Sequence, residues 1–257
     1  MNRNKEQDAN GLMEEPAGKV RLFVEAALAP GAKVALNDAQ AHYLIRVMRA
    51  GIGDRVLLFN GKDGEWRAEI VEVKKRGATL VCDARTEPQS DVPDLWLVFA
   101  PIKKTPADYV AQKATELGVR VLQPVLTRRT IARRVNTERL RANAIEAAEQ
   151  SGRLTVPEIG EPLTLEKLLA SWDKSRRLVF CDEAGEAAPA ASALQEAGRG
   201  SWALIIGPEG GFDPTERSQL RQQSFVLPVS LGPRIMRADT AALAALALWQ
   251  SMLGDWR

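Results

Sequence analysis

The stretch Leu204–Asp213, which reads LIIGPEGGFD, guides the interpretation of the whole chain. Its apolar beginning, Leu204–Ile206, is typical of a buried strand, and Asp213 followed by Pro214 is a typical start of a helix. Between them, three glycines allow the backbone to come close to a ligand. In open parallel α/β sheets, ligands bind where loops leave the carboxyl ends of the strands. The stretch therefore predicts either a tight strand-to-helix connection or a ligand-binding loop.

Two common classes of nucleotide-binding loop do not match this stretch. No Lys-Ser/Thr pair follows the glycines, as a P-loop requires, and their spacing is not GxGxxG. The chain has one histidine, His42, so a Ser-His-Asp triad or a multi-histidine metal site would depend entirely on that residue. The sequence therefore predicts no metal site.

The chain on either side of this stretch alternates between apolar strands and amphipathic helices. The expected strands after Asp94 are LWLVFA, VRVLQPVL, RRLVFC, WALII and FVLPV, with a helix between most neighbours. Nearly continuous apolar strands that alternate with helices indicate a mostly parallel sheet covered on both faces. Residues 95–257 are therefore expected to form an α/β domain.

The N-terminal part has a different pattern. Residues 20–86 contain short runs of period two separated by turn-forming residues, which predict a small β-barrel. A helix is expected over Asp38–Arg49, with Asp38 as its N-cap and Leu44, Ile45, Val47 and Met48 facing a core. Residues 87–94, rich in Pro, Ser and Asp, are expected to be a linker, and the polar residues 1–19 a disordered leader.

The amino-acid composition limits the partners and the cellular compartment that can be expected. Thirty-five Lys and Arg against 33 Asp and Glu give a net charge of +2, so binding to nucleic acid would depend on local clusters of charge. Cys82 and Cys181 lie in apolar runs far apart, as expected of buried thiols in a reducing compartment. No run approaches the length of apolar sequence that a membrane span needs. We expect a soluble cytoplasmic protein.

A second strand-end turn begins at Ser230, in the segment SLGPRIMRADTAALAALALWQSML. From Ala238 the segment is an Ala- and Leu-rich helix that is apolar nearly all round, so it is expected to be buried within the chain or against a partner. Because this turn and the glycine-rich one follow consecutive strands, they could share one cleft. Asp239 suits a helix N-terminus, but Arg237 does not, so Arg237 requires a partner carboxylate or an anionic substrate.

Arginines cluster in TRRTIARRVNTERLR, residues 127–141, against the single acidic residue Glu138. Such a cluster favours phosphate recognition over a plain charged surface, because guanidinium groups bind phosphates through two parallel hydrogen bonds. The candidates for RNA contact are Arg128, Arg129, Arg133 and Arg134, together with Arg21, Arg46 and Arg49 of the N-terminal part. For the last three, solvent-facing charges on a small barrel are an equal alternative.

Two further polar motifs have structural interpretations as well. Lys113 and Glu116 have the spacing of an i, i+3 ion pair on a helix. The residues of EAAEQSGR, which ends at Arg153, could simply close a helix.

Five segments, in order along the chain, are together similar to one known family. They are HYLIRVMRAGIGDRVLLFNGKDGEW, KATELGV, AAEQSGR, LIIGPEGGF and LGPRIMRADTAALAAL. The chain resembles the RsmE family of 16S ribosomal RNA uridine N3-methyltransferases, within the SPOUT superfamily. Its N-terminal segment looks like that family's PUA-like RNA-binding domain.

This resemblance implies a fold, a cofactor and partners. The implied fold is a SPOUT-type α/β domain with a trefoil knot, preceded by the PUA-like barrel. The implied cofactor is S-adenosylmethionine, and the implied partners are 16S ribosomal RNA or the small ribosomal subunit and a second copy of the chain. Carried over by position, the cofactor-binding residues are Leu204, Ile206, Gly207, Glu209, Gly211, Leu231, Gly232, Ile235, Met236 and Arg237. Asp239 and Met236 replace a glutamate and a leucine that are usual in the family.

The resemblance also implies a reaction. The expected activity is methylation of N3 of a specific uridine, in the decoding region of the assembled small subunit, with Arg237 as the catalytic residue that stabilises the anionic base or orients it. A non-catalytic RNA-binding or ribosome-assembly factor of the same fold is the alternative. A nucleotide hydrolase is disfavoured, since the chain lacks the P-loop lysine and a cluster of metal-binding carboxylates.

Overall fold

The computed structural model describes residues 20–101, 104–132, 134–182 and 187–256. The expected leader, residues 1–19, therefore lies outside the described residues. The chain divides into two compact units, Met1–Gln89 and Ser90–Arg257. Each unit has its own hydrophobic core.

The first unit contains a five-stranded sheet with the strand order β1-β3-β4-β5-β2. Strands β1 and β3 are parallel and the other neighbours are antiparallel. Leu22, Val56, Leu58 and Ile70 are among the buried side chains that hold the sheet together. The strands are β1 (Arg21–Phe23), β2 (Lys33–Leu36), β3 (Arg55–Phe59), β4 (Glu65–Lys74) and β5 (Gly77–Glu87).

The helix expected over Asp38–Arg49 is only partly α-helical. Helix α1 (Asp38–His42) begins after Asn37, whose side chain accepts a hydrogen bond from the Gln40 amide at 2.9 Å, so the N-cap is Asn37 and not Asp38. The chain then continues as a π-helix, η2 (Tyr43–Val47). The expectation that Val47 and Met48 face the core was wrong: they are 58% and 44% exposed. The wider π turn places them on the outer side.

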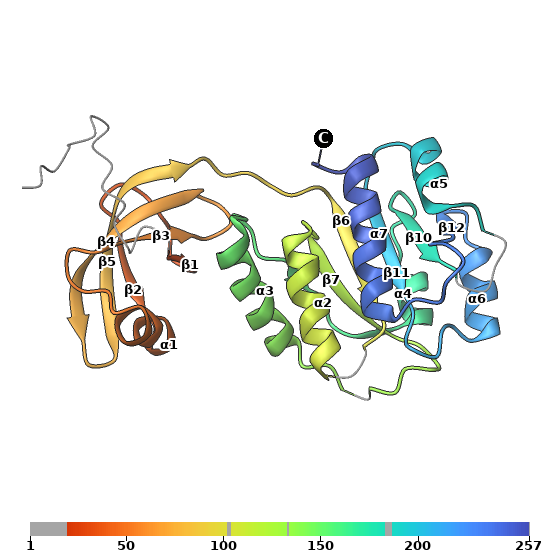
Figure 1. Ribbon diagram of the computed structural model, residues 1–257, viewed down its shortest axis with the longest axis horizontal. Coiled ribbons are helices and arrows are strands. Elements are labelled where there is room, and N and C mark those ends of the chain that lie inside the picture. Colours follow the sequence, from red (N-terminus) through yellow and green to blue (C-terminus); the bar gives the residue numbers. More distant parts are fainter. Residues whose placement is uncertain (1–19, 102–103, 133, 183–186, 257) are drawn as a thin grey trace, which may run out of the picture. The chain divides into compact units, whose positions relative to one another are not determined.

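The second unit is a three-layer α/β domain (Figure 1). Its sheet has the strand order β12-β10-β11-β6-β7-β8, every neighbouring pair is parallel, and β9 pairs with β7. This confirms the predicted parallel sheet. The strands are β6 (Leu95–Phe99), β7 (Val121–Leu126), β8 (Glu158–Ile159), β9 (Leu163–Thr164), β10 (Arg177–Cys181), β11 (Trp202–Ile206) and β12 (Val226–Val229).

Helices cover both faces of this sheet because each strand is apolar on both sides. Leu204 and Ile206 of β11 pack with one set of helices, and Ala203 and Ile205 with the other. The first set comprises α2 (Lys104–Glu116), α3 (Thr137–Ser151), α5 (Ala190–Ala197) and α7 (Ala238–Leu253). The second comprises α4 (Leu165–Ala170) and α6 (Pro214–Arg221). None of the helices within the described residues is long and apolar enough to cross a membrane. The trefoil knot stays a prediction.

Candidate functional site

The glycine-rich connection between β11 and α6, residues 207–213, is here called the glycine loop. A Cβ atom at Gly207 would lie 2.8 Å from the Phe212 ring, so only glycine fits there. Phe212 packs edge-on against Phe180, with ring centroids 5.3 Å apart. The Gly211 amide donates to the Pro208 carbonyl at 2.8 Å, and Gly211 has a left-handed backbone with φ of 67°. The loop is therefore fixed by packing and by its own turn, while Glu209 and Gly210 remain exposed.

The start of α6 closes the glycine loop through a capping box. Asp213 is the N-cap, as predicted, and its side chain accepts from the Thr215 amide at 2.9 Å. That hydrogen bond lowers the pKa of the Asp213 carboxyl below its ordinary value, and the nearby Arg128 and Arg129 lower the pKa further. In return, the buried Glu216 carboxylate accepts from the Asp213 amide at 3.1 Å.

Glu216 also joins the glycine loop to the arginine-rich segment. Its second carboxylate oxygen accepts a hydrogen bond from the Arg128 amide at 2.8 Å. The Arg128 side chain is paired with Asp213 at 3.3 Å, and the Arg129 guanidinium donates to the Gly210 carbonyl at 2.8 Å. Residues 127–130, here called the arginine turn, therefore lie directly against the glycine loop. Glu216 was not among the residues predicted from the sequence, although the Asp-x-x-Glu spacing from Asp213 is that of a capping box.

The second strand-end turn, residues 230–237, is here called the open loop because its side chains are largely exposed. Leu231 and Met236 are half-buried, whereas Ile235 is 89% exposed. Gly232 has φ of 114°, and no atom lies within 4 Å of the position that a Cβ would take. These are apolar side chains next to accessible backbone, a combination that suits a ligand with a flat apolar part and polar edges.

Arg237 is the N-cap residue of α7 and makes no side-chain capping bond. Its side chain is exposed, and among the described residues no carboxylate pairs with it. Asp239 lies in the first turn of α7, where its side chain accepts from the Thr240 amide at 2.8 Å. A cation at a helix N-terminus is electrostatically unfavourable, so helix capping does not account for an arginine at this position.

The two loops leave the same edge of the sheet but do not follow neighbouring strands. Both strands are parallel to β10, which lies between β11 and β12. Ligand contacts from the two loops would therefore come from opposite sides of the end of β10. Two of the residues predicted to bind the cofactor, Leu204 and Ile206, are buried in the core. Their side chains support the glycine loop from within the sheet.

The other predicted RNA contacts fall into different environments. Arg134, Arg46 and Arg49 are exposed, whereas Arg133 lies outside the described residues. Arg21 is nearly buried, where its guanidinium donates to Glu65 at 2.6 Å and lies 4.6 Å above the centre of the Phe59 ring. Arg21 is therefore accounted for by the folding of the first unit.

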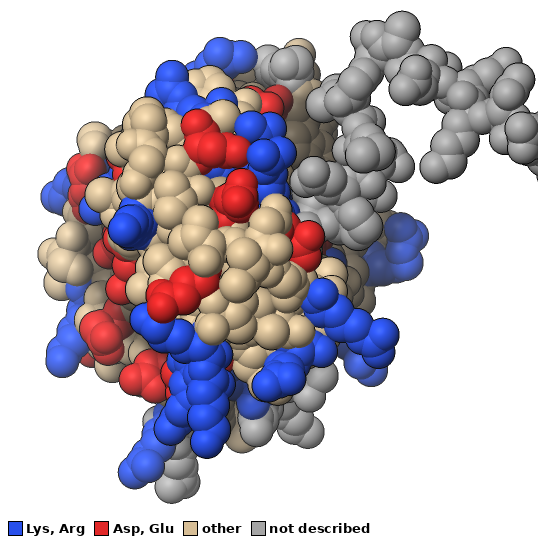
Figure 2. All heavy atoms as spheres, turned by 90° about the vertical axis from the view of Figure 1, so that its left-hand side faces the viewer, with Lys and Arg blue, Asp and Glu red and all other residues tan. Residues whose placement is uncertain are grey.

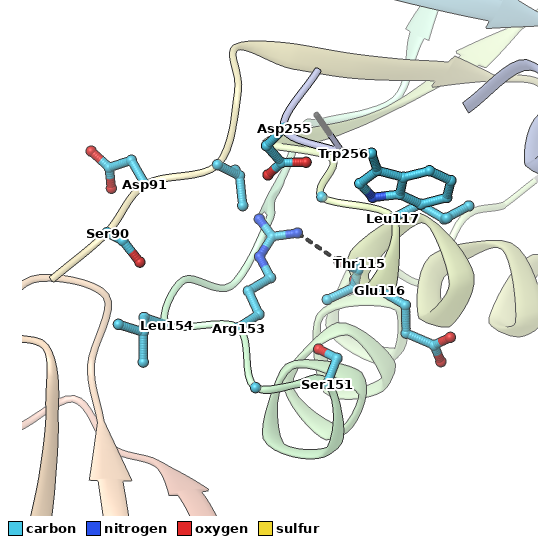
Figure 3. A pocket seen from close by; sticks show the side chains of 13 residues that line it. Ser90, Asp91, Thr115, Glu116, Leu117, Ser151, Arg153, Leu154, Asp255 and Trp256 are labelled. Carbon is cyan, nitrogen blue, oxygen red and sulfur yellow. Dashed lines mark hydrogen bonds between the residues drawn. The ribbon is translucent and has the colours of Figure 1, made fainter. Parts of the chain in front are cut away.

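The segments KATELGV and AAEQSGR meet in a pocket of about 250 Å³ in the second unit (Figure 3). Arg153 is central to it and donates to the Thr115 carbonyl at 2.8 Å and to the Thr155 hydroxyl at 3.0 Å. Burial lowers the pKa of Arg153 to about 10, an effect that the negative charge of Asp255 opposes. Apart from Asp255 and Trp256, which follow α7, the pocket residues precede β6, β7 and β8, so the pocket lies at the amino ends of these strands, away from the glycine loop.

Lys113 is part of neither the glycine loop nor the open loop. It pairs with Glu116 at 2.7 Å, and this contact raises the pKa of Lys113. The predicted i, i+3 ion pair is confirmed. The arrangement links two turns of α2 and requires no ligand.

Comparison with known proteins identifies the family. A family model described as an RNA methyltransferase domain matches residues 88–250, and one described as an RNA methyltransferase PUA domain matches residues 36–81. A relative from Rickettsia conorii, named ribosomal RNA small subunit methyltransferase E, is 32% identical over 229 residues, which cover 88% of this chain and 93% of the relative. A protein of the same name from Bacillus subtilis is 29% identical, with 82% and 87% covered.

Two solved structures match most of the chain. The ribosomal RNA small subunit methyltransferase E from Neisseria gonorrhoeae, solved bound to S-adenosyl methionine, has a TM-score of 0.83 at 27% identity, with 93% of this chain and 99% of that chain covered. A methyltransferase structure from Legionella pneumophila, in complex with the cofactor SAM, has a TM-score of 0.81 at 29% identity, with 92% and 98% covered. The chain therefore belongs to the family of RNA methyltransferases named ribosomal RNA small subunit methyltransferase E, as its sequence motifs predicted.

Proposed function

We propose that the protein transfers a methyl group from S-adenosylmethionine to N3 of a specific uridine in 16S ribosomal RNA. This proposal rests on one observation. A fixed glycine loop and an apolar open loop leave the same edge of the sheet, and the open loop ends at Arg237, an arginine without a carboxylate partner among the described residues. The relatives' names and the cofactor bound in both neighbouring structures support the same reaction. The choice of N3 and of the decoding region of the assembled subunit rests on the resemblance to the RsmE family.

The two loops would hold the cofactor through different groups. The exposed residues Glu209 and Gly232 bring backbone groups that could bond the polar edges of the cofactor, at Gly232 through its carbonyl because its amide donates to the Ser230 hydroxyl. Leu231, Ile235 and Met236 would cover its adenine ring, an apolar contact to which Ile235 would bring an exposed side chain and the other two half-buried ones. When bound, S-adenosylmethionine supplies an already activated methyl group, so the protein has mainly to position the acceptor and control its charge.

Arg237 would control the charge of the acceptor. Uridine reacts at N3 only after losing the N3 proton, which leaves negative charge on the ring nitrogen and its two carbonyl oxygens. The Arg237 guanidinium, with no carboxylate partner among the described residues, can donate charge-assisted hydrogen bonds to such an oxygen. This interaction lowers the pKa of N3 and fixes the orientation of the ring.

The RNA backbone would be held by arginines outside the cofactor loops. Arg128, Arg129 and Arg134 lie in or beside the arginine turn, and Arg46 and Arg49 belong to the first unit. We assign residues 20–86 to RNA binding and residues 95–257 to methyl transfer. A homodimer in the cytoplasm is part of the proposal, with the half-buried side chains of α7, such as Leu243 and Leu248, as the apolar contact.

Calorimetric titration of the full chain with S-adenosylmethionine tests the cofactor. Saturable binding is expected, and its absence would leave the non-catalytic RNA-binding factor as the better description. Mapping of methylated nucleotides in 16S ribosomal RNA from cells that lack the protein tests the substrate. Loss of one N3-methyluridine is expected, restored by the wild-type gene and not by an Arg237→Ala variant. Loss of a different modification would contradict the assignment to N3.

A further inference from the structure

The π-helix η2 changes which side chains of the first unit face outward. The Met48 amide donates to the Tyr43 carbonyl at 2.9 Å, a hydrogen bond that spans five residues instead of four. The extra residue in this turn shifts the side chains that follow relative to Leu44, compared with an α-helix. Leu44 is fully buried and anchors the turn in the core. Leu44 thus holds the turn in the core, whereas Tyr43, Val47 and Met48 remain exposed.

Four large apolar side chains of this segment are exposed and lie close together in the sequence. Tyr43, Val47, Met48 and the nearby Ile52 are the members of what we call the platform, and all four are exposed. Large apolar side chains gathered within ten residues are unusual on a free surface and mark places where a partner binds. π turns within α-helices are also frequent at functional sites.

Two arginines accompany the platform. Arg46 and Arg49 are both exposed, and the structure gives neither side chain an ion pair within the described residues. Arg49 has φ of 59°, and it is the one non-glycine residue in the described part of the chain with a left-handed backbone. Such conformations persist where the surrounding structure enforces them, and they cluster at binding sites.

The acidic side chains of this region are occupied elsewhere. Asp38 is paired with Arg76 at 2.7 Å, and Asp54 accepts a hydrogen bond from the Gly51 amide at 2.7 Å. The charges of Arg46 and Arg49 are therefore not matched by a neighbouring carboxylate in this segment. The face of the molecule in Figure 2 carries acidic and basic side chains intermixed, which makes a local pair of unmatched arginines more informative than total charge.

We propose that the platform stacks an unpaired base of RNA, with Arg46 and Arg49 holding the adjoining phosphates. An aromatic ring flanked by apolar side chains is the surface on which single-stranded bases stack, and guanidinium groups suit the backbone beside them. A protein partner would account for the exposed apolar side chains but would not explain the two arginines beside them. This inference rests on the proposed function, because it takes RNA as the substrate.

Direct RNA binding by the full-length chain tests the platform. The probes are a labelled single-stranded oligouridine and a hairpin whose stem contains the same number of nucleotides in duplex form. The variants are Tyr43→Ala, Tyr43→Phe and, as a matched control, Tyr109→Ala, because Tyr43 and Tyr109 are both 42% exposed. Tyr43→Ala is expected to weaken single-strand binding roughly tenfold and leave hairpin binding unchanged. Tyr43→Phe and Tyr109→Ala should bind both probes like the wild type.

Salt dependence separates the arginines from the ring. Arg46→Gln should reduce the slope of log affinity against log salt by about 1, whereas Tyr43→Ala should leave that slope unchanged. Equal weakening of both probes by Tyr43→Ala, or no weakening, would overturn the proposal. Loss of binding to intact small subunits without loss on oligouridine would overturn it as well, and would identify a ribosomal protein as the partner.

The same assay distinguishes failure of the platform from failure of the proposed function. RNA binding is measured without S-adenosylmethionine, so a protein that binds no cofactor can still stack a base. Cofactor titration of Tyr43→Ala should match the wild type, because Tyr43 lies in the first unit and the cofactor loops lie in the second.

Discussion

The glycine loop and the open loop leave the same edge of one sheet, but they are held in opposite ways. The glycine loop is tied by the Pro208–Gly211 turn, by the packing of Phe212 and by the carboxylate of Glu216. Between Leu231 and Met236, the hydrogen bond that the described residues show is from the Gly232 amide to the Ser230 hydroxyl at 3.2 Å. The glycine loop is therefore ordered by contacts within the protein, whereas the open loop has few such contacts.

This difference predicts a division of roles. A loop that is already ordered pays no further conformational entropy when a ligand binds, so its contacts contribute fully to affinity and position. A loop that is open can close over a ligand, and it loses conformational entropy when it becomes ordered on binding. Substitutions in the glycine loop should therefore lower stability, and substitutions of the exposed side chains of the open loop should lower activity or affinity with little change in stability.

Arg237→Ala should have the largest effect. Removing a positive group that stabilises developing negative charge is expected to lower kcat by about 100-fold or more, as seen for other single charge-stabilising donors. The free energy of unfolding should change by less than about 0.5 kcal/mol, because Arg237 is exposed and unpaired within the described residues. Single-turnover methylation and urea unfolding measure the two quantities.

Arg234→Ala is the matched control for this prediction, because Arg234 is an exposed arginine of the same loop. It should keep methylation near the wild-type rate. Equal losses from both arginines would mean that the loop supplies only a general positive charge, and the specific role of Arg237 would be abandoned.

Glu216→Ala should have the largest effect on stability. The buried carboxylate accepts hydrogen bonds from the Arg128 and Asp213 amides, and its removal leaves both donors without a partner. Two partly buried amides without a partner and a lost cap together should lower the free energy of unfolding by about 2–4 kcal/mol. Glu138→Ala is the control, since Glu138 lies exposed in the first turn of α3 and should cost under about 1 kcal/mol. Equal losses of stability in the two variants would mean that Glu216 acts only through its charge near the helix N-terminus.

The sequence was sufficient to predict the sheet, the capping of α6 and the family. The apolar pattern of the strands, the capping residue Asp213 and the five ordered motifs each depend on residues that are close in the sequence. They can therefore be interpreted without coordinates. The sequence could not predict that β10 separates the two loops, because strand order depends on packing between segments far apart in the chain. It also failed at Val47 and Met48: an apolar pattern specifies a face only if the number of residues per turn is known, and the π turn changes that number.

The two loops also differ in why they need glycine. At Gly207 a Cβ would press against the Phe212 ring, whereas at Gly232 it would meet open space but require a φ of 114°. Gly207→Ala is therefore expected to cost about 2 kcal/mol through overpacking, and Gly232→Ala about 1 kcal/mol through backbone strain. Urea unfolding measures both.

A double-mutant cycle distinguishes crowding from strain. Phe212→Leu should recover part of the loss caused by Gly207→Ala, because the two side chains compete for one space. The same change should add independently to Gly232→Ala. Additive effects in both cycles would show that Gly207 is required for its backbone alone, and the contrast between the loops would weaken.

Ile235→Ser should have the smallest effect on the fold and a selective effect on binding. Ile235 is 89% exposed, so replacing it removes no core contact and should change the free energy of unfolding by less than about 0.5 kcal/mol. If the open loop closes over the adenine ring, the lost apolar contact should weaken S-adenosylmethionine binding about tenfold, which corresponds to about 1.4 kcal/mol. Calorimetry should also show a less negative heat-capacity change of binding. Ile131→Ser, at another exposed isoleucine, should leave cofactor affinity unchanged. An unchanged affinity in Ile235→Ser would mean that the open loop stays open when the cofactor binds, and that the fixed glycine loop carries the binding alone.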